Sequence, residues 1–140
     1  MKARSSTMPA RLPPDNSEEW IRRARSSLAI ARCCTPDIYL EDLCFQAQQS
    51  AEKAIKAVFI ARALPLPYIH DISELLLRLE RSGLVIPDAI KSAARLTPFA
   101  VHTRYPGFEF PVSEEEYTGA LALAESVVRW AETVIQDKKS

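Results

Sequence analysis

The segment Thr103-Arg104-Tyr105-Pro106-Gly107 holds the residue types best suited to contact a phosphorylated ligand. The guanidinium of Arg104 can bind a phosphate through two parallel hydrogen bonds, and the ring of Tyr105 offers a face on which a base can stack. The proline and glycine that follow let the backbone turn sharply beside them. The alternative is structural, with Arg104 paired to an acidic side chain and Tyr105 packed in the core.

Two further polar positions have side chains that suit a ligand. His70 stands at the expected start of a helix, where it can meet a ligand, cap that helix or hydrogen-bond a neighbouring loop. Gln48 lies beside Gln49 on an alanine-rich helix, where a buried amide needs hydrogen-bond partners and can fix the packing of the loop 103–105. For both positions a structural role is the alternative to ligand binding.

The cysteines and clustered acids do not form a metal-site pattern. Cys33, Cys34 and Cys44 are odd in number, and no two of them have the spacing of two to four residues that zinc ligands use. We predict buried thiols. The acidic run 114–116 is explained as the first turn of a helix, where carboxylates are favoured. We expect no metal and no cofactor.

The composition fits one folded domain. The chain has 140 residues, of which 47% are hydrophobic and 26% charged, so it can bury a sizeable core. Its 18 basic and 18 acidic residues exclude the global basicity that drives non-specific nucleic-acid binding. Residues 1–35 hold seven basic and three acidic side chains, whereas residues 108–140 hold three and seven. The two ends either match each other across a bundle or dimer, or form separate solvated faces.

No apolar run reaches the roughly 18 to 20 residues that a membrane span needs. The basic N-terminal stretch, which contains Pro9, Pro13 and Pro14, lacks the apolar core of a signal peptide. We therefore expect a cytoplasmic protein without membrane contact.

Hydrophobic periodicity predicts five helices. Residues 1–14 show no period and are expected to form a flexible arm, followed by a single domain over residues 15–137. The helices are expected from about residue 15 to 34, from Thr35-Pro36-Asp37 to Ala63, for three turns from His70 or Asp71, from Pro87 to Thr97, and from the capping box of Ser113 onward.

The second of these helices has the clearest apolar face. Its inward positions, at spacings of three and four, are Leu40, Leu43, Ala47, Ala51, Ala54 and Val58, widened by Cys44, Ile55 and Phe59. Gln48, Glu52 and Lys56 are four residues apart on the other side. Because most connections are short, the sequence predicts an all-α fold, an up-and-down antiparallel four-helix bundle plus one short additional helix.

The order of three segments resembles the HEPN domain family. These are the helix Cys44-Phe45-Gln46-Ala47-Gln48-Gln49-Ser50-Ala51-Glu52-Lys53-Ala54, the start His70-Asp71-Ile72, and Thr103-Arg104-Tyr105-Pro106. The resemblance covers about residues 17–135. It implies a helical bundle, frequent homodimerisation, association with nucleotide or RNA, and frequent pairing with a small nucleotidyltransferase encoded beside it in toxin and antitoxin operons.

The resemblance also implies a catalytic motif. Many HEPN proteins are metal-independent ribonucleases that use an arginine and a later histidine with four to six residues between them. In such a pair the histidine exchanges a proton and the arginine stabilises charge on the phosphate. Arg95 and His102 match the spacing at its upper limit. This chain departs from the family at Leu96, where a polar residue is usual, and at Pro98, which falls inside the motif.

Two classes of function follow. In the first, the protein is a binding module, a dimeric HEPN bundle that recognises nucleotide or RNA phosphate through residues 103–105 or docks onto a nucleotidyltransferase. In the second, it is a ribonuclease toxin whose Arg95 and His102 act across a homodimer. A purely structural helix bundle that mediates interactions is the third alternative.

Overall fold

Helices make up most of the described chain. A computed structural model describes residues 11–100 and 111–139, and within those ranges it contains no strand. Its elements are α2 (Ser17–Ala31), α3 (Leu40–Ala61), α4 (Ile72–Arg81), α5 (Asp88–Lys91), the 3₁₀ helix η1 (Ser92–Ala100) and α6 (Glu114–Lys139). The predicted all-helical bundle is confirmed. No helix in these ranges is both long and apolar enough to cross a membrane.

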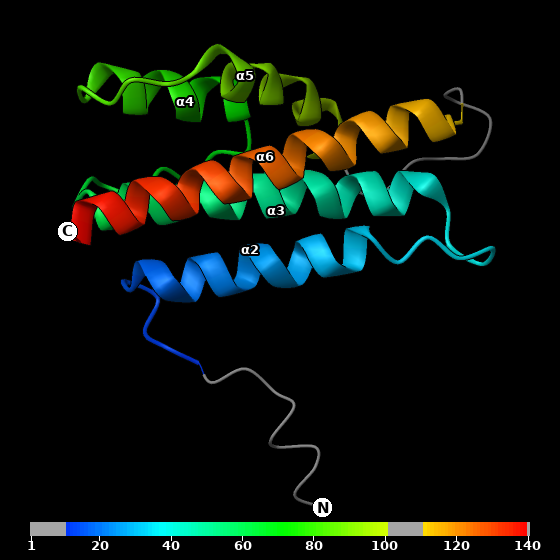
Figure 1. Cartoon of the computed structure of the whole chain (residues 1–140), viewed down its shortest axis with the longest axis horizontal. Helices are drawn as coiled ribbons and strands as arrows, with labels where there is room; N and C mark the ends of the chain where they lie inside the picture. The colour runs from blue at the N-terminus through cyan, green and yellow to red at the C-terminus, as the bar shows by residue number, and fades with distance from the viewer. Residues whose placement is uncertain (1–10, 101–110, 140) are drawn as a thin grey trace, which may run out of the picture.

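The long helices α2, α3 and α6 lie side by side, and α4 and α5 form a second layer on one side of them (Figure 1). The alanines of α3 allow this close packing, since Ala47, Ala51 and Ala54 are fully buried between neighbours. The predicted inward face of α3 is therefore correct.

Two ion pairs fix the register of α2 against α6. Arg25 contacts Glu132, and Arg32 Nη2 lies 2.7 Å from Glu125 Oε2. Each pair is about two helical turns from the other on both helices, and the numbers run in opposite directions, as antiparallel helices require. Two basic side chains of residues 1–35 thus pair with two acidic side chains of residues 108–140 across the bundle. Because these side chains are partly exposed, each pair contributes only about 1 kcal/mol or less.

Side-chain caps set most of the helix starts. Asn16 accepts a hydrogen bond from the Glu18 amide at 2.8 Å, and Asp71 begins α4 in the same way. The predicted capping box of α6 is present, with Ser113 and Glu116 exchanging hydrogen bonds of 3.0 and 3.1 Å. These caps satisfy amide groups that a helix start leaves without a partner.

The predicted start of the second helix at Thr35-Pro36-Asp37 is wrong. α2 ends at Ala31 and α3 begins only at Leu40. The amide of Ile38 donates to the Thr35 carbonyl at 3.1 Å, which closes a turn instead. Residues 32–37 are exposed, so a helix there would bury no face, and a single helical turn is unstable without packing.

The predicted end of the fourth helix before Pro98 is also wrong. The α-helix α5 is one turn long, and the chain continues as η1 through Pro98 to Ala100. The reason is the apolar spacing: Ile90, Ala93 and Leu96 recur every three residues and are buried, and a 3₁₀ helix places such residues in line.

The end of α3 holds an alanine in a conformation that favours glycine. Ala63 has φ 57°, and the amide of Leu64 donates back to the Phe59 carbonyl at 2.9 Å. This is the Schellman arrangement that closes many helices. The left-handed conformation crowds the side-chain carbon of alanine and costs about 1 kcal/mol.

We predict that Ala63→Gly raises the free energy of unfolding by about 1 kcal/mol, because glycine adopts this conformation without strain. Urea denaturation followed by circular dichroism measures the change. The matched control is Ala29→Gly, at an exposed position inside α2, which should lower stability by about 1 kcal/mol. Destabilisation by both substitutions would contradict the assignment of strain to Ala63.

Candidate functional site

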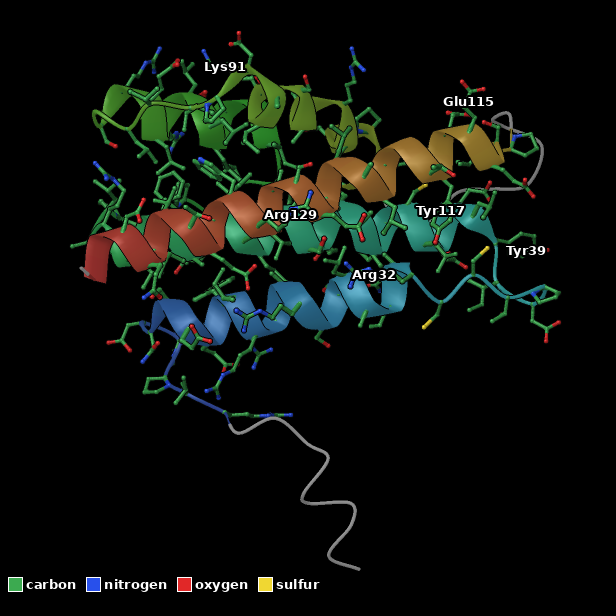
Figure 2. The ribbon with its side chains drawn as sticks, in the orientation of Figure 1. Arg32, Tyr39, Lys91, Glu115, Tyr117 and Arg129 are labelled. Carbon is green, nitrogen blue, oxygen red and sulfur yellow. The ribbon has the colours of Figure 1, made fainter. Side chains whose placement is uncertain are left out.

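Arg95 lies on the rim of an open hollow between the second layer and α6. The hollow encloses about 760 Å³. Its walls come from α5 and η1 on one side and from the first half of α6 on the other; Figure 2 marks Glu115 near the start of α6. Residues that line it are Ala89, Ser92, Arg95, Leu96, Phe99, Ser113, Glu115, Glu116, Gly119, Ala120, Ala122, Leu123 and Ser126.

The hollow combines one cation, Arg95, and two carboxylates with a lining of otherwise small and apolar groups. Arg95 is exposed and forms no ion pair with any described residue. Phe99 adds an aromatic ring on the same wall, while Glu115 and Glu116 lie opposite. An unpaired guanidinium beside an aromatic ring can bind a phosphate and stack a base.

The remaining residues of the predicted loop site, His102, Thr103, Arg104 and Tyr105, lie outside the described residues. The chain leaves the described part after Ala100 and returns at 111, close in sequence to residues that line the hollow on both sides. Of the predicted catalytic pair, the structure therefore places Arg95 alone.

A second polar site is buried against α3. Glu52 is only 4% exposed, yet its carboxylate has three partners. Lys56 Nζ lies 2.8 Å from Oε2, Gln48 Nε2 donates to Oε1 at 2.9 Å, and His70 Nδ1 lies 3.0 Å from both oxygens. We call these four residues the Glu52 cluster. Each of its hydrogen bonds involves a buried charge, which makes the cluster sensitive to loss of any partner.

The partners keep Glu52 ionised despite its burial. Burial by itself would raise the pKa of this carboxyl group, but hydrogen bonds from Lys56, Gln48 and His70 outweigh that effect and hold the pKa below its ordinary value of 4.5. A carboxylate only accepts hydrogen bonds, so Nδ1 of His70 must carry a hydrogen.

The cluster contains the two remaining predicted site residues, His70 and Gln48. His70 is exposed at its ring and anchored through Nδ1, and Gln48 is fully buried, with its amide also 3.4 Å from the His70 carbonyl oxygen. Gln48 thus positions His70, whereas His70 can still meet a ligand. Gln48, Glu52 and Lys56 share the side of α3 that sequence analysis assigned to polar residues, but that side is buried and not exposed. The segment 64–71 and the second layer pack against it.

Sequence reasoning missed the burial of Glu52 and Lys56. The spacing of four was visible and does form hydrogen bonds within α3. What the spacing could not indicate is that both faces of this helix are covered. The usable signal was the alanine content of α3, which extends beyond one narrow stripe and suits a helix with neighbours on several sides.

A lysine and a serine also meet between α2 and α3. Lys53 Nζ donates to Ser27 Oγ at 2.8 Å, and burial, together with the charge of Arg23, lowers the pKa of Lys53. Serine and lysine pairs of this kind can act as nucleophile and base. Here Ser27 is 3% exposed, so a substrate cannot reach its hydroxyl and the pair is structural.

The cysteines differ from expectation. Cys44 is buried as predicted, but Cys33 and Cys34 are exposed in the turn after α2, so the prediction of buried thiols is wrong for both. Their exposure has the same cause as the late start of α3, namely the absence of packing around this turn. Within the described ranges, no three His, Cys, Asp or Glu side chains come together as metal ligands would.

Comparison with known proteins agrees with this architecture. The HEPN domain pattern matches residues 17–134. The chain belongs to the HEPN family. Similar solved structures include TT1696 from Thermus thermophilus, with 30% sequence identity, a TM-score of 0.69, and coverage of 84% of this chain and 97% of that one.

A second related structure is ST0689, described as an archaeal HEPN homologue. It has 28% identity, a TM-score of 0.69, and coverage of 86% of this chain and 98% of the other. No curated protein matches significantly. The HEPN assignment therefore rests on both sequence and fold.

We predict that Glu52→Gln lowers the free energy of unfolding by about 3 kcal/mol near pH 7, because it leaves Lys56 buried without its counter-charge. The pKa of Glu52 is depressed in the folded chain, so ionised Glu52 stabilises the fold fully above about pH 4.5. This contribution is lost as the pH falls through the pKa that Glu52 has in the folded chain. Urea unfolding of the unmodified protein and of Glu52→Gln, repeated from neutral to acidic pH, should show their free energies of unfolding approaching each other as the pH falls.

The control for this experiment is Glu132→Gln, which removes a partly exposed ion pair and should change stability by about 1 kcal/mol or less. If the difference in free energy of unfolding between Glu52→Gln and the unmodified protein stayed constant with pH, the charge of Glu52 would not be the cause of that difference.

Proposed function

We propose that this HEPN protein binds nucleotide or RNA phosphate at the hollow that carries Arg95. The observation behind the proposal is that Arg95, exposed and without an ion pair among the described residues, lines the same hollow as Phe99. Arg104, Thr103 and Tyr105 would add a second cation, a hydroxyl and a stacking ring to the same ligand. His70, held by Gln48 and Glu52, is a separate contact on another part of the surface.

The expected result is that Arg95→Ala weakens RNA binding about tenfold or more, since a charge-assisted hydrogen bond contributes about 1.5 to 3 kcal/mol. Fluorescence anisotropy with a labelled single-stranded RNA measures the dissociation constant at fixed salt. The matched control is Arg129→Ala, which removes an exposed arginine of α6 outside the hollow (Figure 2). Equal losses in the two variants would indicate non-specific charge attraction instead.

A second candidate is metal-independent RNA cleavage by Arg95 and His102. It is favoured by the exposure of Arg95 at the hollow, where a phosphate can reach the guanidinium. Incubation with RNA in the presence of a chelator separates the two candidates. Cleavage that disappears in both Arg95→Ala and His102→Ala supports the enzyme, whereas cleavage unchanged in both excludes these residues.

We also propose a homodimer in which the α6 faces beside the hollow meet. Gly119, Ala122 and Ser126 present small side chains there, which let two helices approach closely, and two copies of Arg95 would then border one composite cleft. Ala122→Arg is expected to shift the protein from dimer to monomer in light scattering. The control Ala29→Arg, at an exposed alanine of α2, should leave the dimer intact.

The HEPN family further suggests a small nucleotidyltransferase as partner in a toxin and antitoxin pair. Co-expression with the protein encoded by the neighbouring gene, followed by affinity purification, tests this part. A neighbour unrelated to nucleotidyltransferases would count against the pairing without affecting RNA binding at the hollow.

A further inference from the structure

The connection between α3 and α4 presents two rings to solvent. Along residues 64–70, the apolar side chains of Leu64, Leu66 and Ile69 pack against the core. Tyr68 and His70 point outward, with exposed fractions of 93% for Tyr68 and 71% for the side chain of His70. Because the two residues are only two positions apart, their Cα atoms lie within about 7 Å of each other, so the two exposed rings belong to one small part of the surface.

This segment is held rigidly at both ends. At its start, the Leu64 amide closes α3 by its hydrogen bond to Phe59. At its end, the Gln48 amide contacts the His70 carbonyl and the Glu52 carboxylate holds the His70 ring. Prolines at positions 65 and 67 further restrict the backbone. A ligand that stacks on Tyr68 would therefore order little additional chain, which lowers the entropic cost of binding.

The Glu52 cluster also fixes the hydrogen-bonding character of His70. Because Nδ1 carries the hydrogen that Glu52 accepts, Nε2 is a hydrogen-bond acceptor whenever the ring carries a single hydrogen. In that form the exposed ring of His70 offers a hydrogen-bond acceptor two residues from the exposed ring of Tyr68. A nucleotide supplies the complement, a planar base with amino groups and, in RNA, a 2′-hydroxyl donor.

We propose that Tyr68 and His70 form a second contact site for single-stranded RNA, in which a base stacks on Tyr68 and an amino or 2′-hydroxyl group donates to Nε2 of His70. The site is separate from the hollow, because no residue of the segment 64–71 lines it. The proposal rests on the proposed function in one respect, that RNA is the ligand. Glu52 and Gln48 are positioning residues here.

The test uses the intact protein and a fluorescein-labelled decamer of adenosine ribonucleotides, read by anisotropy. Tyr68→Ala should weaken binding about tenfold, in keeping with the loss of one stacked base, while Tyr68→Phe should retain it. His70→Ala should weaken binding, and His70→Gln, which keeps an acceptor, should weaken it less. The matched control is Tyr39→Ala, which removes an aromatic ring that is 75% exposed at the start of α3.

Two further probes identify the chemistry. A decamer of the same length with abasic nucleotides should bind equally to the unmodified protein and to Tyr68→Ala, because no base remains to stack. A deoxyadenosine decamer distinguishes the two donors: affinity reduced to the level of His70→Ala indicates the 2′-hydroxyl, and unchanged affinity indicates the amino group. Either result supports the site.

The outcomes separate this site from the hollow. Affinity lost in Arg95→Ala but unchanged in Tyr68→Ala overturns the present inference alone. Affinity lost in Tyr68→Ala but unchanged in Arg95→Ala supports it and overturns the hollow. Failure of the unmodified protein to bind the decamer overturns both, and equal losses in Tyr68→Ala and Tyr39→Ala overturn a specific stacking role. Because Tyr68 is almost fully exposed, thermal melting of its variants should match that of the unmodified protein.

Discussion

The buried carboxylate of Glu52 is the constraint on which the packing of the other helices around α3 depends. Glu52 lies on α3, which contacts α2, α4, η1 and α6, so the charge must be satisfied where several elements meet. Lys56 and Gln48 satisfy it from within α3, and His70 does so from the following segment. Because His70 stands directly before the cap of α4, the same hydrogen bonds fix where the second layer begins.

Two further contacts hold the elements of the second layer against one another. Thr97 of η1 accepts a hydrogen bond from the Ile72 amide at 3.1 Å, and Lys91 of α5 lies 2.8 Å from Glu80 of α4. These contacts align α5 and η1 antiparallel to α4. They also leave Arg95 on the side that faces α6, where the hollow forms. The position of Arg95 therefore depends on the packing of residues far from it in sequence.

The two surfaces proposed to meet RNA differ in their physical basis. The hollow offers a cation and an aromatic ring in a concave surface, where attraction between Arg95 and a phosphate would act against the two carboxylates of Glu115 and Glu116. The segment 64–71 offers an aromatic ring and an oriented acceptor on a rigid backbone, which suits stacking and donor recognition instead. A HEPN chain with no net charge has no general attraction for RNA, so local arrangements of this kind would have to supply the binding.

Local sequence patterns were sufficient to predict the fold class, the apolar face of α3 and the capping box of α6, because these depend on residues within a few positions of one another. The HEPN resemblance rested on the order of three segments along the chain, which the sequence also contains. Pattern reasoning failed at the start of α3, at Pro98 and at Cys33 and Cys34, where neighbouring packing, or its absence, overrode local preference. The folded arrangement was needed to show that Glu52 and Lys56 are buried, that Gln48 holds His70, and that Arg95 borders a hollow. These results depend on which segments cover each helix face, and hydrophobic periodicity along one helix does not contain that information.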